Sequence, residues 1–119
     1  MLTLGPDDIL LDRHAQDWQA ALDSAAKALA EAGLVEAEYR DGLHAREAQS
    51  STYLGNAIAI PHGTPESRHL VKRTGVRVLQ FPQGVQWHDG NTVHVLVTIA
   101  AQNDEHLDIL RQLTHVLDR

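Results

Sequence analysis

His62 is the side chain of this sequence best placed to do chemistry. It is preceded by Ala-Ile-Ala-Ile at positions 57–60, a short apolar run with β-branched residues that predicts a buried strand. Pro61 then stops strand pairing, because proline has no N–H to donate. Gly63 follows the histidine and lets the backbone turn away. The sequence therefore predicts a titratable ring held at the tip of a rigid strand.

A neutral imidazole in that position could act as a nucleophile toward a phosphoryl group. Its ordinary pKa is about 6.5, so one ring nitrogen is unprotonated near neutral pH. That nitrogen can attack if the other keeps its proton through a hydrogen bond to a carbonyl or carboxylate. The phosphoryl oxygens would need cations or donors, for which Arg46, His106 and Thr52 are the candidates.

The candidate helpers also have structural interpretations. Arg46 falls in the last turn of a predicted helix, where a cation interacts favourably with the helix dipole. The spacing of His106 fits a core histidine as well as it fits a phosphate ligand. Both interpretations stay open on these grounds alone.

Other site chemistries find little support in the sequence. The chain has eight histidines and no cysteine, but it contains no His-x-x-x-His pair and no His-Glu-x-x-His helix. It also lacks a Gly-x-Ser-x-Gly elbow and a glycine-rich phosphate loop. We therefore expect no metal, no cofactor, and neither a serine nor a cysteine nucleophile.

Composition and length indicate which kind of protein this is. The chain has 119 residues, a hydrophobic content of 43% and a formal net charge of −6, which fit one globular domain spanning 1–119. Without a basic cluster, nucleic acid is not expected as a partner, whereas a basic protein surface is. The sequence shows no signal peptide and no apolar run of membrane-spanning length, so we expect a cytoplasmic protein without membrane insertion.

Hydrophobic periodicity predicts the elements that hold these residues. A helix is expected over 15–32 and a second over 36–49, although Gly42 weakens the second by about 1 kcal/mol relative to alanine. Strands are expected over 76–81 and 92–100, with the latter central, and a final helix from Asn103 onward. Residues 64–68 are expected to form a loop, and residues 82–84, Pro-Gln-Gly, a turn. The inward-facing residues expected on the first two helices are Trp18, Ala21, Leu22, Ala25, Leu29, Ala32, Val35, Tyr39, Leu43 and Ala45.

At residues 54–63, Leu-Gly-Asn-Ala-Ile-Ala-Ile-Pro-His-Gly, the chain resembles the phosphorylation motif of enzyme IIA domains of the bacterial phosphoenolpyruvate:sugar phosphotransferase system, fructose/mannitol type. The resemblance is closest to the N-terminal IIA portion of fructose multiphosphoryl transfer proteins, which fuse this domain to HPr-like modules and sometimes to an enzyme I module. It extends through nearly the whole chain, on the segments Arg46-Glu47, 51–55, 74–76, 80–85, 103–107 and 113–117.

The resemblance implies a function. His62 would accept a phosphoryl group from phospho-HPr and pass it to a cysteine of the fructose-specific IIB domain. Arg46 and His106 match positions that the family places beside the active histidine, so they are expected to stabilise the phosphate. Glu47, Thr52 and Glu105 lie in matching motifs without an assigned role. The alternatives are a regulatory, nitrogen-related IIA paralogue, an interaction module without turnover, and a histidine-bound metalloenzyme.

The resemblance also implies a fold. The family is α/β, with a mixed β-sheet flanked by helices on both faces. Family members continue with further helical sequence, so we expect a domain whose C-terminal helical part is missing. Apolar surface that this part covers would then be exposed or covered by a neighbour.

Overall fold

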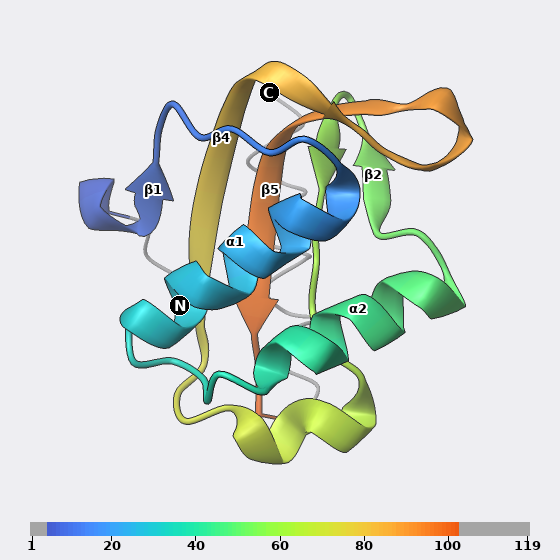
Figure 1. The fold of residues 1–119 in the computed structure, drawn as a ribbon. Coiled ribbons are helices and arrows are strands. Elements are labelled where there is room, and N and C mark those ends of the chain that lie inside the picture. Colours follow the sequence, from blue (N-terminus) through green and yellow to red (C-terminus); the bar gives the residue numbers. More distant parts are fainter. Residues whose placement is uncertain (1–4, 103–119) are drawn as a thin grey trace.

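A computed structural model of the chain describes residues 5–102 (Figure 1). These residues form two α-helices, five strands and three short 3₁₀ helices. The α-helices are α1 (Trp18–Glu31) and α2 (Tyr39–Gln49). The strands are β1 (Ile9–Leu10), β2 (Tyr53–Gly55), β3 (Ile58–Ala59), β4 (Gly75–Gln86) and β5 (Thr92–Ala100). The 3₁₀ helices are η1 (Pro6–Asp8), η2 (Pro65–Leu70) and η3 (His88–Gly90).

The strands form one mixed sheet in the order β1-β4-β5-β3-β2. β1 runs parallel to β4 and β3 runs parallel to β5, whereas the β4–β5 and β2–β3 pairs are antiparallel. The predicted α/β class, the mixed sheet and the central place of β5 are therefore confirmed. Figure 1 shows α1 and α2 lying across one face of the sheet, in front of β4 and β5. The helix expected from Asn103 onward lies outside the described residues.

Side-chain alternation along β4 and β5 divides the core between the two faces of the sheet. Leu79 is paired with Leu96, and both pack beneath the helices. Val76 is paired with Ile99, and both belong to a second buried cluster, which also contains Ile60. Because side chains on a strand point alternately to opposite faces, one register buries both sets.

The helices begin later than the periodicity predicts, for local reasons. The Asp17 carboxylate accepts a hydrogen bond from the Ala20 N–H at 2.8 Å, so it caps α1 and fixes its start at Trp18. In α2, Tyr39 and Leu43 are buried as expected, but Ala45 is exposed and Glu47 is buried instead. The expectation for Ala45 was wrong, because the buried stripe of α2 reaches its last turn at Glu47.

Two segments differ from the sequence-based expectation. β4 continues through Pro82 and Gly84, which were expected to form a turn, because an irregularity between Gln80 and Val85 accommodates them. The segment expected to be loop at 64–68 instead contains η2, with Pro65 in its first turn. Within residues 5–102, no helix combines the length and the apolar character needed to cross a membrane.

Candidate functional site

His62 lies at the sheet edge where the two parallel strands β3 and β5 both end. β3 ends at Ala59, and pairing with β5 continues past it, because the Ile99 N–H donates to the Pro61 carbonyl oxygen at 2.9 Å. Pro61 itself is buried. Binding sites of open α/β sheets are commonly found beyond the carboxyl ends of their strands. The structure thus presents His62 from a rigid, buried base, as the sequence predicts.

The ring of His62 is held through one of its nitrogens. Its Nδ1 lies 2.9 Å from the carbonyl oxygen of Ile60. A carbonyl oxygen only accepts hydrogen bonds, so Nδ1 carries the proton in this arrangement. In the neutral ring the lone pair is then on Nε2. This is the orientation that nucleophilic attack by Nε2 requires.

A small pocket beside the ring is lined by Tyr39, His62, Gly63, Arg68 and Ala101. The Tyr39 hydroxyl accepts from the Gly63 N–H at 2.9 Å and donates to the Ile99 carbonyl oxygen at 3.2 Å. Burial raises the pKa of the Tyr39 phenol, while the Gly63 hydrogen bond and the charge of Arg68 act in the opposite direction. Tyr39 therefore ties α2 to the backbone on both sides of the site.

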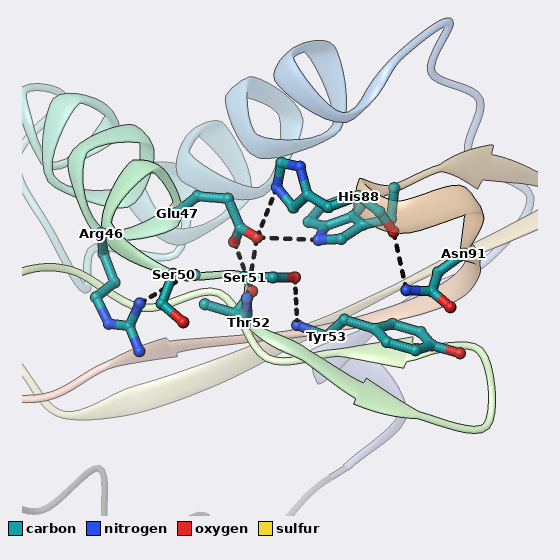
Figure 2. Close-up of polar contacts among 9 residues, drawn as sticks. Arg46, Glu47, Ser50, Ser51, Thr52, Tyr53, His88 and Asn91 are labelled. Atoms are coloured by element: carbon teal, nitrogen blue, oxygen red, sulfur yellow. Dashed lines mark hydrogen bonds and ion pairs between the residues drawn. The ribbon is translucent and has the colours of Figure 1, made fainter.

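Arg46 lies at the junction between α2 and β2. Its Nη1 donates to the carbonyl oxygen of Ser50 at 2.8 Å, and Figure 2 shows the guanidinium turned toward that residue. The junction runs beside the segment that carries the histidine, because the Ile60 N–H donates to the Thr52 carbonyl oxygen at 3.0 Å. The role of Arg46 as a phosphate ligand stays a prediction.

Glu47 is a buried carboxylate that joins three parts of the fold (Figure 2). It accepts from the Thr52 N–H at 2.9 Å and from the Thr52 hydroxyl at 2.6 Å. It also accepts from Trp87 Nε1 at 3.0 Å, and His88 Nε2 lies 3.1 Å from the same oxygen. The Thr52 hydroxyl is thus buried and hydrogen-bonded to Glu47, which argues against the suggestion that it donates a hydrogen bond to the phosphoryl oxygens.

His106, the second expected phosphate ligand, lies outside the described residues, as does Glu105, which has no assigned role. Ala101 follows β5 directly and lines the pocket beside His62, so the chain leaves β5 next to the ring. The assignment of His106 as a phosphate ligand stays a prediction. In the part of the chain that the structure describes, no group of three or more His, Asp or Glu side chains is arranged to hold a metal ion.

Arg68 and the hydroxyl of Tyr39 were not expected beside His62 from the sequence. Tyr39 was expected to face inward, but its spacing predicted only packing. Arg68 was assigned to a loop, because residues 64–68 carry no apolar period that would indicate η2. The available signal was the position of Arg68, six residues after His62, combined with Pro65 as a helix-starting residue.

The chain is similar to known proteins along nearly its whole length. Residues 3–119 match the family model "Phosphoenolpyruvate-dependent sugar phosphotransferase system, EIIA 2". A multiphosphoryl transfer protein of Haemophilus influenzae is 56% identical over 117 residues, covering 98% of this chain and 23% of that protein. The mannitol-specific phosphotransferase enzyme IIA component of Geobacillus stearothermophilus is 41% identical over 116 residues, covering 98% of this chain and 80% of that protein.

The fold is also that of a solved relative. The complex of enzyme IIAMTL and phosphorylated enzyme IIBMTL from Escherichia coli contains a chain with a TM-score of 0.93 and 36% identity, covering 100% of this chain and 84% of that one. The present chain spans less than a third of the length of the multiphosphoryl transfer proteins it matches. By the family model and these relatives, the chain belongs to the EIIA 2 family of the phosphoenolpyruvate-dependent sugar phosphotransferase system.

Proposed function

We propose that this domain carries phosphoryl groups in sugar uptake. His62 takes the group from the phosphohistidine of HPr and passes it to a cysteine of a fructose-specific IIB domain, in the cytoplasm. The observation that carries the proposal is the hydrogen bond between His62 Nδ1 and the Ile60 carbonyl oxygen, at 2.9 Å. It fixes the ring and keeps the lone pair of its neutral form on Nε2.

Each transfer exchanges one bond to phosphorus for another. In the first, the Nε2 lone pair forms a bond to phosphorus while the bond to the donor's imidazole nitrogen breaks, and that electron pair returns to the donor ring. In the second, a cysteine thiolate forms the S–P bond, and the electron pair of the N–P bond returns to Nε2. The proton stays on Nδ1, hydrogen-bonded to the Ile60 carbonyl oxygen, whose dipole stabilises the positive charge that the ring acquires.

The transferred oxygens need positive charge around them. We assign Arg46 and His106 to this task, in which positioning and electrostatics contribute more than covalent chemistry. Arg46 lies at the end of α2, beside the strand segment that leads to His62. The proposal uses no metal and no cofactor, because a cationic side chain can supply the charge that a metal would.

The sugar branch is proposed from the relatives. Identity to the Haemophilus influenzae multiphosphoryl transfer protein is 56%, against 41% for the mannitol-specific component. The Escherichia coli IIAMTL complex supports a IIB domain as the class of acceptor. A fructose-specific IIB domain is therefore the first acceptor to test. The alternative, a regulatory IIA paralogue that controls other proteins, would accept the group on His62 but fail to pass it to a sugar-specific IIB domain.

The test is a reconstituted transfer. The domain is incubated with enzyme I, HPr and phosphoenolpyruvate, and the phosphorylated mass is measured before and after mild acid. We expect one acid-labile phosphoryl group, lost in His62→Ala. His69→Ala is the matched control, because the exposed His69 also has its Nδ1 against a carbonyl oxygen, that of Glu66, at 2.9 Å. A phosphorylated His62→Ala variant would overturn the assignment.

A second stage separates the branches. The phosphorylated domain is mixed with a fructose-specific or a mannitol-specific IIB domain, and loss of the phosphoryl group is followed over time. Faster transfer to the fructose-specific domain supports the proposal. Faster transfer to the mannitol-specific domain moves the chain to that branch, and no transfer to either favours the regulatory alternative.

A further inference from the structure

We propose that Arg68 is a third cation of the phosphoryl site and contacts the oxygens of the group carried by His62. This inference rests on the proposed function and adds a residue to it. Arg68 belongs to η2, which follows His62 in the chain, and its partly buried side chain lines the same small pocket as the histidine ring. A cation there would meet a phosphoryl group bound to Nε2.

The position of Arg68 is fixed by the residue before it. Ser67 is 5% exposed, and its hydroxyl donates to the Thr64 carbonyl oxygen at 2.8 Å. A Cβ at Gly42 would lie 2.5 Å from the Ser67 Oγ, and a Cβ at Gly63 would lie 2.4 Å from it. Ser67 thus fits between α2 and the backbone behind His62 only because both neighbours are glycine. This packing explains Gly42, which otherwise weakens α2.

That packing holds the backbone of η2, which carries Arg68, in a fixed position. Figure 1 shows η2 beneath α2, and the two elements are in contact. Because Ser67 fills the space left by the two glycines, the backbone of Arg68 is held at a fixed place relative to His62. A side chain presented in this way loses less freedom when it binds an anion, so its contribution to phosphate binding is larger.

The charge of Arg68 already acts on the pocket. It favours the ionised form of the Tyr39 phenol, whose oxygen accepts from Gly63. The guanidinium therefore lies close enough to a pocket atom for its field to matter. A phosphoryl group brings negative charge to this place, in a domain whose net charge is −6. Arg68 would stabilise the phosphorylated form relative to the free histidine.

The experiment compares removal of an arginine that lines the pocket with removal of an arginine outside it, so that the change in net charge is the same. Arg68→Gln and Arg68→Met remove the cation from the pocket, and Arg68→Lys keeps it without the planar fork. Arg73→Gln is the matched control, because Arg73 is exposed and donates to the Ala32 carbonyl oxygen at 3.1 Å, outside the pocket lining. The rate at which each full chain accepts the phosphoryl group from phospho-HPr is measured, together with the half-life of the phosphohistidine and the urea midpoint.

We expect both neutral variants of Arg68 to accept the group about ten- to a hundredfold more slowly than the wild type, with an unchanged urea midpoint. The rate of Arg68→Lys should lie between those of the neutral variants and the wild type, and Arg73→Gln should match the wild type. Equal rates for the Arg68 and Arg73 variants would overturn the inference while His62 remained the carrier. A wild-type chain that takes no phosphoryl group would refute the proposed function instead. If one neutral variant is destabilised, the other decides the comparison.

Discussion

Removing the carboxylate of Glu47 should destabilise the domain severely, although this residue carries a charge and sits on a helix. In Glu47→Ala, the Thr52 N–H and the Trp87 indole N–H, both buried, lose their acceptor. Each orphaned donor costs about 1–3 kcal/mol, and the lost packing adds roughly 1 kcal/mol. The Thr52 hydroxyl can rotate, and the His88 side chain is 29% exposed and can reach water, so neither adds a full penalty. The free energy of unfolding should fall by about 4 kcal/mol.

The amide variant tests this reasoning more finely. In Glu47→Gln, the amide oxygen can take the place of the carboxylate oxygen that meets Thr52 N, Trp87 Nε1 and His88 Nε2. The amide nitrogen can then donate to the Thr52 hydroxyl oxygen, which accepts as well as donates. Only the strengthening of these bonds by the negative charge is lost, so we expect a cost of about 1–2 kcal/mol.

The assay is urea unfolding followed by tryptophan fluorescence, supported by thermal unfolding. In a domain of this size, about 4 kcal/mol corresponds to a fall in Tm of roughly 15 °C. Glu38→Ala is the matched control, because Glu38 is exposed at the start of the same helix and its side chain makes no capping hydrogen bond. It should change stability by less than about 0.5 kcal/mol. If Glu47→Ala unfolds no more easily than Glu38→Ala, the network around Glu47 does not support the fold.

Three further substitutions test other parts of the account. Gly42→Ala should lower the free energy of unfolding by about 1–3 kcal/mol through its clash with Ser67, and a more stable variant would show that helix propensity dominates instead. Because burial raises the pKa of Tyr39, its contribution to stability is present below pH 10 and is lost as the pH rises above it. The free energy of unfolding of Tyr39→Phe should therefore fall less between pH 9 and about pH 11 than that of the wild type, and an equal fall in both would contradict this. Burial opposes ionisation of Asp23, but hydrogen bonds and charges of Arg40 and His44 outweigh it and lower its pKa, so its contribution is present above pH 3.8 and is lost as the pH falls. Asp23→Asn should therefore show a weaker dependence of stability on acid pH than the wild type, measured by urea unfolding between pH 6 and about pH 2.5.

The parts of the fold that sequence reasoning predicted are those with a strong local signal. β5 is a nearly continuous apolar strand and proved central in the sheet. α1 has apolar residues at helical spacing, and Leu22 and Leu29 are buried as expected. His62 could be placed because the apolar run before it ends at Pro61, which cannot continue strand pairing.

The parts that were missed depend on partners far along the chain. Glu47 looks like an exposed helix residue, and only Trp87 and His88, about forty positions later, make its burial possible. Arg68 has a weak signal in its position after His62 and Pro65, but its place in the pocket depends on how Ser67 packs against Gly42. No local pattern of hydrophobicity encodes such contacts, because they depend on how distant elements pack.

The central claim is that His62 attacks through Nε2 while its Nδ1 keeps the proton, hydrogen-bonded to the Ile60 carbonyl oxygen. The most direct measurement is nitrogen NMR of the domain labelled with ¹⁵N-histidine, recorded before and after phosphorylation by enzyme I, HPr and phosphoenolpyruvate. We expect Nδ1 of His62 to carry the proton in the free domain, and phosphorus coupling to appear on Nε2 alone. A phosphoryl group on Nδ1, or on any residue other than His62, would contradict the account.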